Sequence, residues 1–355
     1  MMSEEKMRVN HKTLEAFVSA LFAYAGMREA DAAFHARALV QTNLWGVDSH
    51  GVLRVPVYVE RLRSGAMNPR PETRIIRGAG ALEVMHGDDG PGFIVGRDAM
   101  NRAMELAEAH SLGAVGVIHS NHFGAAGIYA RLAADGDMIG IAMTNVIPNI
   151  VAPGGGKPVT GNNPLAIAVP TFSEFPFVLD MSLSKVAGGK LLLAKKRGEK
   201  IPLDWATDAE GRPTEDPEEA FDGFLLPMGG YKGLGLSYVV DILSGLITGG
   251  VFGDDIKSMY RHRDEPSLTC HFMIAIDPLK LMDKAEMEKR MASFYERVKT
   301  SPMWDESKEM YLPGEIEYLT ALRRRERGIP ISQNLYDELT ALGEEMGTDV
   351  SLGDL

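Results

Sequence analysis

Cysteine is nearly absent from this sequence, and Cys270 is its only example in 355 residues. A single thiol cannot form a disulfide within the chain, and it excludes zinc sites built from four cysteines. No apolar run reaches the ~20 residues that a bilayer-spanning helix needs, so we expect no membrane partner. The opening residues, MMSEEKMRVN, lack the apolar segment of a secretory signal, and we therefore expect a cytoplasmic protein.

Concentrated positive charge is also missing. The chain holds 37 Lys and Arg against 49 Asp and Glu, a net charge of −12, and its longest basic run is Arg323 to Arg325. We interpret that run as a solvated helix face near a helix C-terminus. Binding to a phosphate backbone requires clustered Lys and Arg, so nucleic acid is not expected as a partner. The 45% apolar and 24% charged residues are typical of a soluble globular protein, and the length predicts two or three lobes.

The sequence does contain a clear alternation of helical and strand patterns. Apolar residues at helical spacing predict three helices at the start of the chain, over residues 11–27, 31–45 and about 54–62. Strands are then predicted at 81–86, with a turn at 88–90, and at 113–120, 138–145, 164–171, 175–181 and 268–276. Further helices are predicted at 93–110, 124–135, about 185–197, 231–250, 279–299, 314–327 and 332–345, and residues 198–230 are loop-rich. This order predicts an α/β core flanked by helical segments.

Four stretches combine reactive side chains with glycine or proline at predicted element ends, where loops on a rigid scaffold commonly carry function. The first is Asp48-Ser49-His50-Gly51, between two helices. The positive end of a helix dipole disfavours an extra proton on His50, which suits the imidazole to proton exchange near pH 7. A capping turn in which the histidine is incidental explains the same residues.

The second stretch is HSNHFGAAGIYA, residues 119–130. It places His119 and His122 at a strand end, before a helix that opens with small residues. Free backbone N–H groups at such a point favour an anion. Two other interpretations stay open: a metal pair that carboxylates or other histidines would complete, or one capping and one core histidine.

The remaining two stretches are rich in glycine. Gly154 to Gly156 and Gly161-Asn162-Asn163-Pro164 keep the backbone open ahead of Asp180, which is either an orienting group for a histidine or a helix N-cap. In GGYKGLGL, Lys232 at a helix start can meet a phosphate or a carboxylate, or it can lie in an exposed entry loop. This stretch is not the Rossmann dinucleotide fingerprint, because Tyr238 stands where the third glycine is required.

Together the four stretches describe a glycine-lined cleft with two histidines, an arginine and an acid. The G-x-S-x-G, Walker A and H-E-x-x-H motifs are absent from the sequence. The combination favours proton and hydride chemistry on a small anionic substrate over metal-dependent hydrolysis.

Several long motifs also occur in a fixed order: DSHGVLRVPVY, SNHFGAAGIYA, TNVIPNIVAPGGG, GNNPLAIAVP, LDMSLSKVAGGK, IPLDWATDAEGRPTEDP, LLPMGGYKGLGLSYVVDILSG and LPGEIE. In this order they resemble the type 2 malate/L-lactate dehydrogenase family, over about residues 10–340. That family also holds ureidoglycolate dehydrogenase, 2,3-diketo-L-gulonate reductase, sulfolactate dehydrogenase and Δ1-piperideine-2-carboxylate reductase. The motifs are therefore specific for the family and not for the substrate.

The resemblance implies an NAD(P)-dependent oxidoreductase that interconverts a small 2-hydroxy acid and a 2-oxo acid, with NAD or NADP as cofactor. It implies a homodimer and an α/β fold whose NAD(P)-binding domain is not Rossmann. That domain has a mixed central sheet and is flanked by helical N- and C-terminal segments. We expect residues 1–75, which carry DSHG, to pack with the helices of 310–355. Residues 76–309 would then form the dinucleotide- and substrate-binding region.

The resemblance also implies roles for single residues. By motif position His50 is similar to the proton donor to the carbonyl oxygen, with Ser49 and Asp180 as its relay partners. His122 is similar to the acid/base residue of some members, and we rank His50 first. Arg54 is the expected clamp for the substrate carboxylate, because a guanidinium fork matches a carboxylate in two places.

Further residues are assigned to the substrate or the dinucleotide by the same resemblance. Asn145 is expected beside the substrate. The residues expected to contact the dinucleotide are His122, Phe123, Gly124, Asp180, Met181, Ser182, Tyr231, Lys232, Pro313, Gly314 and Glu315. The stretch Gly161-Asn162-Asn163-Pro164 departs from the family's usual G-T-N-P, and Asn162 adds bulk to that loop while it keeps a hydrogen-bonding side chain. The stretch DMSLS differs mildly from the commoner DMATS.

Two other functions stay open. One is a reductase of a cyclic imine 2-carboxylate, from the same family but with C=N chemistry. The other is a metal-dependent lyase or isomerase that uses His119, His122 and acids. The identity of the substrate and the choice between NAD and NADP are not fixed by the sequence, since the acidic-residue rule for the ribose applies only to Rossmann folds.

Overall fold

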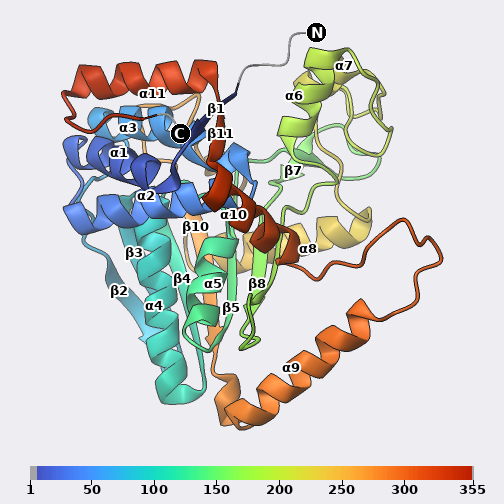
Figure 1. The fold of residues 1–355 in the computed structure, drawn as a ribbon. Coiled ribbons are helices and arrows are strands. Elements are labelled where there is room, and N and C mark those ends of the chain that lie inside the picture. Colours follow the sequence, from blue (N-terminus) through green and yellow to red (C-terminus); the bar gives the residue numbers. More distant parts are fainter. Residues whose placement is uncertain (1–5, 354–355) are drawn as a thin grey trace.

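A seven-stranded sheet lies at the centre of the computed structural model, which describes residues 6–353 (Figure 1). Its strand order is β2-β3-β4-β10-β5-β8-β9. The strands are β2 (Arg74–Ala79), β3 (Leu82–Gly90), β4 (Leu112–Ser120), β5 (Ile139–Thr144), β8 (Leu165–Val169), β9 (Phe177–Met181) and β10 (Thr269–Ile276). Strands β3 and β4 run parallel, whereas the other neighbours are antiparallel. The prediction of an α/β fold with a mixed central sheet is confirmed.

Two helices that connect strands, α4 (Gly92–His110) and α5 (Gly127–Asp135), pack on this sheet. The parallel pair β3 and β4 is joined by α4, as parallel neighbours require a crossover connection. Close packing depends on Gly113 in β4, because a Cβ there would overlap the carbonyl oxygen of Ala103 and the side chain of Leu106 in α4. The apolar patterns of the sequence predicted β4 and α4 because the residues that each element buries are apolar.

Helices from both ends of the chain lie together above the sheet (Figure 1). They are α1 (His11–Tyr24), α2 (Glu29–Leu44) and α3 (Val55–Ser64) from the start, and α10 (Glu315–Arg327) and α11 (Gln333–Met346) from the end. Helix α11 contacts α1 and α3, and α10 contacts α2. Strand β1 (Lys6–Val9) also pairs antiparallel with β11 (Ile329–Ser332). The division of the chain at residues 75 and 310 into separate units stays a prediction.

A smaller lobe surrounds α6 (Gly188–Arg197) and α7 (Pro217–Asp222) at the upper right of Figure 1. It has its own apolar core, formed by residues such as Ile150, Leu191 and Leu225. The short strands β6 (Ile150–Val151) and β7 (Pro158–Thr160) pair beside it. Below the lobe, α8 (Tyr231–Asp241) continues into a π-helical turn, η3 (Ile242–Leu246).

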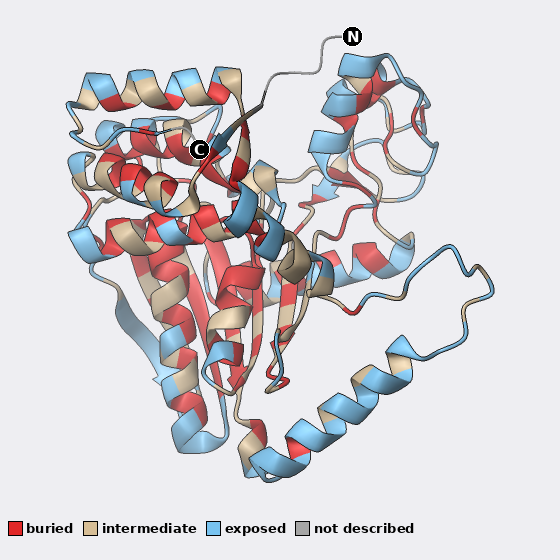
Figure 2. Cartoon of the chain, in the orientation of Figure 1, coloured by how far each residue is buried: buried red, intermediate tan, exposed pale blue. Residues whose placement is uncertain are grey.

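Helix α9 (Lys284–Lys299) projects from the body at the lower right of Figure 1, and it is mostly exposed (Figure 2). Two short 3-10 turns, η4 (Gly253–Asp255) and η5 (Pro278–Lys280), lie on either side of β10 in the sequence. The helices of residues 6–353 are each too short or too polar to cross a bilayer.

Several predicted elements are wrong in their extent. Strand β2 was not predicted, because all its residues are exposed and its sequence does not alternate. The turn predicted at 88–90 lies inside β3, where Asp88 and Asp89 take positive φ angles of 54° and 51°. The helix predicted over 231–250 is α-helical only to Asp241, and the one predicted from residue 124 begins at Gly127.

Candidate active site

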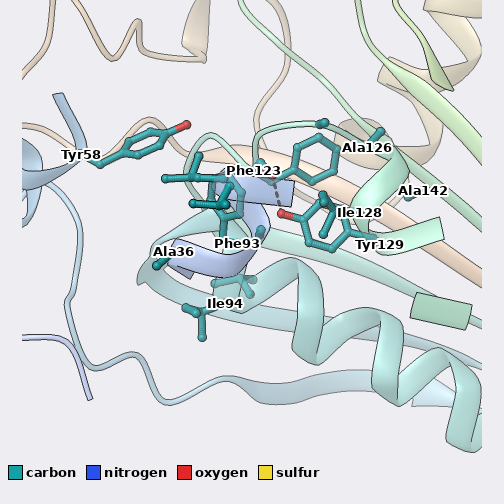
Figure 3. Close-up of a cluster of buried hydrophobic side chains, with 14 of the residues drawn as sticks. Ala36, Tyr58, Phe93, Ile94, Phe123, Ala126, Ile128, Tyr129 and Ala142 are labelled. Atoms are coloured by element: carbon teal, nitrogen blue, oxygen red, sulfur yellow. Dashed lines mark hydrogen bonds between the residues drawn. The ribbon is translucent and has the colours of Figure 1, made fainter. Parts of the chain in front are cut away.

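A cleft of about 580 Å³ opens where the N-terminal helices, one end of the sheet and the start of α10 meet. Its walls come from the 3-10 turn η1 (Asp48–His50), the loop after β4, the ends of β5 and β9, and the turn before α10. Behind the β4 loop, Phe123 stacks on Tyr129 with ring centroids 4.8 Å apart, and the Tyr129 hydroxyl donates to the Phe123 carbonyl (Figure 3). This packing gives the loop a rigid apolar base.

His50 and His122 meet at one end of this cleft. Their rings stack with centroids 5.7 Å apart. The Ser49 hydroxyl lies 2.9 Å from His50 Nδ1. The sequence places these two histidines 72 positions apart, so the fold has brought together two predicted acid/base candidates.

His122 is oriented by two donors on one ring nitrogen. The Tyr58 hydroxyl lies 2.6 Å from His122 Nδ1, and the backbone N–H of Gly124 approaches the same atom at 3.3 Å. Because the N–H of Gly124 can only donate, Nδ1 is the acceptor and the neutral ring carries its proton on Nε2.

Both imidazoles are neutral near pH 7. Burial lowers the pKa of His50 to about 4, and the positive charge of Arg54 adds to this effect. Burial also places the pKa of His122 well below its usual value, with smaller contributions from His50 and Arg54. The sequence predicted a lowered pKa for His50 from a helix dipole; the direction holds, but desolvation is the main cause.

The turn that presents His50 is fixed by contacts to α2 and α10. Asp48 accepts from both terminal nitrogens of Arg324, at 2.5 and 3.0 Å, and from the side-chain amide of Asn43 at 2.7 Å. Asn43 also accepts from the N–H of Val52 at 2.8 Å. Gly51 is required here, because a Cβ would overlap the Asn43 side chain. The prediction of a solvated Arg323–Arg325 face is therefore wrong for Arg324, which is mostly buried.

Asp180 lies at the end of β9, across the cleft from η1. Its carboxylate accepts a hydrogen bond of 2.8 Å from the N–H of Gly127 at the start of α5. The residue is exposed toward the cleft, although protein atoms surround its carboxylate. This burial raises the pKa of Asp180 to about 6, although the Gly127 hydrogen bond opposes the rise. Ser49 and Asp180, predicted as relay partners, thus both line the cleft.

Arg54 ends the 3-10 turn η2 (Val52–Arg54) and is the N-cap residue of α3. Its Nε donates to the carbonyl oxygen of Ser49 at 2.7 Å, and its guanidinium lies 5.6 Å from the ring centroid of Tyr260. Among residues 6–353, none accepts a hydrogen bond from its two terminal nitrogens. The planar guanidinium of Arg54 therefore has two parallel N–H donors that no described residue occupies, although Arg54 is not among the residues that line the cleft.

Residues 9–340 match the family model for malate/L-lactate dehydrogenase. The chain belongs to this family.

Relatives within the malate/L-lactate dehydrogenase family match the chain along nearly its whole length. The malate dehydrogenase of Pyrococcus abyssi is 38% identical and covers 97% of this chain and 96% of its own. The solved structure of sulfolactate dehydrogenase from Methanocaldococcus jannaschii superposes with a TM-score of 0.91, at 35% identity, over 97% of this chain and 98% of that one.

Two further relatives carry a cofactor in their names. The (2R)-3-sulfolactate dehydrogenase (NADP(+)) of Chromohalobacter salexigens is 36% identical, over 94% of this chain and 97% of its own. The ureidoglycolate dehydrogenase (NAD(+)) of Escherichia coli K12 is 30% identical, over 94% of this chain and 95% of its own. The predictions of the family and of a dehydrogenase acting on a CH–OH group are confirmed.

Most residues that the family resemblance assigned to the dinucleotide line the cleft. They are His122, Phe123, Gly124, Asp180, Met181, Ser182, Pro313 and Gly314. Glu315 instead fastens the turn before α10, since it accepts from Lys299 at 2.7 Å and from the N–H of Leu312 at 2.9 Å. Tyr231 and Lys232 lie outside the cleft lining, at the exposed start of α8.

Asn145, assigned to the substrate, is fully buried at the cleft floor. Its side chain donates to the carbonyl oxygen of Val251 at 2.9 Å and accepts from the N–H of Cys270 at 2.8 Å. Those contacts fasten the segment after η3 and the start of β10 to the residue that follows β5. The neighbouring Asn162, which replaces the usual threonine, also lines the cleft and accepts from Asn149 at 3.2 Å.

His119 points to a different cluster from His122. Its Nδ1 lies 3.1 Å from Asp89 Oδ1, and its ring stacks on His86 at 4.4 Å. Across residues 6–353, no three His, Cys, Asp or Glu side chains gather in an arrangement that could hold a metal ion.

Sequence reasoning missed several residues of the site. Those that line the cleft are Trp45, Arg131, Phe175, Tyr311, Glu317 and Tyr318. Tyr58 was missed too, although it lies four positions after Arg54 inside the DSHGVLRVPVY motif. That spacing puts both residues on one helix face and was a usable signal.

Proposed function

We propose that this protein interconverts a small 2-hydroxy acid and its 2-oxo acid by direct hydride transfer with NAD or NADP, and that His50 is the proton donor. The observation that carries the proposal is the pair of stacked rings, His50 and His122, at one end of a glycine-lined cleft. Membership of the malate/L-lactate dehydrogenase family supports the reaction class.

The residues of the cleft fit a dinucleotide. A volume of about 580 Å³ is typical of cofactor pockets. Phe175 and Ile316 offer apolar surface to flat rings, while Asp180 and Ser182 offer polar partners to ribose hydroxyls. Gly127 is needed for this arrangement, because a Cβ there would lie 2.8 Å from Asp180 Oδ2. When bound, a reduced nicotinamide supplies the hydride, and the chain supplies position and charge.

His50 suits the proton transfer in both directions. Toward the 2-oxo acid, the neutral imidazole accepts the proton of the substrate hydroxyl directly. Toward the 2-hydroxy acid, His50 must first be protonated, and the charge of Arg54 opposes this. A substrate carboxylate bound at Arg54 offsets that charge and raises the pKa of His50, so that substrate binding and proton uptake favour each other.

The first experiment assays 2-oxo acids, among them oxaloacetate, pyruvate and sulfopyruvate, with both NADH and NADPH, and ureidoglycolate in the oxidation direction. We expect turnover of at least one acid. In the His50→Ala variant, kcat should fall by roughly a thousandfold, because general acid catalysis is lost. The Kd of the nicotinamide cofactor should stay within about twofold.

Matched variants decide between the two histidines. Near-normal kcat in His50→Ala, together with a large loss in His122→Ala, would move the proton role to His122. Absence of turnover with every acid would contradict the proposed function. The panel also includes a cyclic imine 2-carboxylate, because exclusive reduction of that compound would select the imine reductase alternative.

We also propose that the protein is a homodimer. Support comes from the exposed apolar face of α8 and η3, where Leu236, Val239, Ile242 and Leu246 recur at helical spacing and are each 40–47% exposed. Contiguous apolar surface of this kind marks protein contacts. The cytoplasmic location of the protein, expected from the first residues of the sequence, stays a prediction.

A further inference from the structure

A loop of residues 257–267, here called the strap, is fastened to α3. Arg61 of α3 donates to two strap carbonyls, those of His262 at 2.7 Å and Glu265 at 2.8 Å, and to the hydroxyl of Ser267 at 3.2 Å. Glu60 adds an ion pair to Arg263 at 3.0 Å, and the Ser64 hydroxyl donates to the carbonyl of Arg263. The strap is thus held along about one turn of the helix, from Glu60 to Ser64.

Arg61 also bonds the side chain of Asn121, the residue before His122. It is 1% exposed, and its Nη2 donates to Asn121 Oδ1 at 3.0 Å. The same oxygen accepts from the N–H of Ser267, while the Asn121 amide donates to the carbonyls of Asp89 and Gly90. A buried guanidinium with neutral acceptors costs desolvation energy, so this position joins three segments of the chain at some cost in stability.

One helix face, formed by α3 and its N-cap residue Arg54, therefore carries the side chains that contact His122, Asn121 and the strap. Arg54, Tyr58 and Arg61 stand at i, i+4 and i+7, which places them on one helix face. Tyr58 holds His122, Arg61 holds the strap and Asn121, and Arg54 keeps its terminal nitrogens for the substrate. The strap returns to this helix face at Tyr260.

Tyr260 is the strap residue that contacts the Arg54 guanidinium. Its ring centroid lies 5.6 Å from Arg54 Cζ, within the range of a cation–π contact. The Nε of Arg54 is fixed on the other side by the carbonyl of Ser49. A guanidinium held at both the ring face and Nε loses little freedom when its terminal nitrogens bind a carboxylate.

We propose that Tyr260, carried by the strap and anchored through Arg61, is a positioning residue that holds the Arg54 guanidinium ready for the substrate carboxylate and so sets the affinity for 2-oxo acids. This inference rests on the proposed function, in which Arg54 binds the carboxylate. It adds Tyr260, which lies 206 positions from Arg54 and, like Arg54, outside the cleft lining, to the determinants of substrate binding.

The test compares Tyr260→Leu with Tyr260→Phe. Removal of the ring in Tyr260→Leu should raise KM for the preferred 2-oxo acid about fivefold, the size of an exposed cation–π contact. The values of kcat and of KM for the nicotinamide cofactor should stay within about twofold. Tyr260→Phe keeps the ring face and should restore KM. Tyr24→Leu, which removes an exposed tyrosine of α1, is the matched control and should change nothing.

A second measurement separates this inference from the proposed function. Calorimetry gives the Kd of oxalate, which carries carboxylates but cannot be reduced, and Tyr260→Leu should weaken it by the same factor even in the absence of turnover. Unchanged oxalate affinity in Tyr260→Leu, with a tenfold or greater loss in Arg54→Ala, would overturn the role of Tyr260 alone. Unchanged affinity in Arg54→Ala would overturn the carboxylate assignment itself. A Tyr260→Phe variant that behaves like Tyr260→Leu would also exclude the ring contact.

Discussion

Four histidines have pKa values well below the usual value for imidazole. Burial lowers the pKa of His35 and of His271 to about 3, that of His50 to about 4, and that of His122 well below its usual value. His271 bonds Thr144 and Ser120 through its two nitrogens. His35 instead lies between the rings of Phe22 and Phe93, each 4.2 Å away, and among residues 6–353 neither of its nitrogens has a hydrogen-bond partner.

Because of these histidines, we expect the free energy of unfolding to fall at acidic pH. A group whose pKa is lower in the folded state binds its proton first in the unfolded chain, so its stabilising effect is complete above pH 6.5 and is lost as the pH falls toward the folded pKa. For His35, whose pKa burial lowers to about 3, this removes about 2 kcal/mol between pH 6.5 and pH 5. In His35→Leu the free energy of unfolding should depend less on pH by that amount, as urea titrations at pH 7.5 and pH 5 will measure.

The matched control for this prediction is His110→Leu, at the exposed end of α4. It should keep the pH dependence of the unmodified chain. Equal slopes for His35→Leu and the unmodified chain would show that His35 takes up its proton without unfolding.

The sequence could identify single residues of the site only where a motif carried them. His50, His122 and Asp180 were predicted and do line one cleft. Tyr260 and Arg61 were not, because their partners lie about 200 positions away and nothing local marks either residue. Asp48 and Arg324 show the same limit, since each looks like a surface residue until α10 is placed on α2.

At the scale of elements, the contact between β4 and α4 depends on the absence of a side chain at Gly113. Gly113→Ala adds a Cβ that meets the carbonyl of Ala103 and the side chain of Leu106. Because backbone cannot move aside cheaply, we expect a loss of at least about 2 kcal/mol in the free energy of unfolding. Gly189→Ala in α6, where a Cβ meets open space, is the control and should be neutral or slightly stabilising. If Gly113→Ala and Gly189→Ala have the same urea midpoint of unfolding, the argument for close packing at Gly113 is contradicted.

The predicted element boundaries agree with the structure for strands whose apolar runs have clear ends, and they differ from it for the helix that begins at Tyr231. Strands β4, β5 and β10 were predicted to within one residue at each end, because their apolar runs are bounded by glycine or polar residues. The helix from Tyr231 was predicted too long. Its apolar residues continue to Ile247, but the hydrogen bonding changes to a π-helical turn after Asp241, which periodicity alone does not reveal.

For the whole molecule, the proposed homodimer predicts a measurable mass. Sedimentation should give twice the mass of the chain, and Val239→Lys combined with Ile242→Lys should give a monomer, because buried ammonium groups without partners oppose association. Tyr24→Lys, on α1, is the control. A monomeric unmodified protein would contradict the homodimer, whereas a dimer that survives both lysines would place the contact on another face.

The fold class and the flanking helical segments could be predicted from the order of the patterns. The position of each strand within the sheet could not, since β10 enters between β4 and β5 after more than a hundred residues. The projecting helix α9 is also a feature of the whole molecule, because nothing in its own sequence distinguishes it from a helix packed on the body.

The pairing of β1 with β11 has a consequence for how the chain is made. Val9 pairs with Ile329, so the first strand to leave the ribosome has no partner until some 320 further residues have been synthesised. At about 5–20 residues per second, this leaves β1 waiting for roughly 15 to 65 s. During that interval the nascent chain presents an unpaired strand edge, which gives a chaperone that binds extended segments its opportunity.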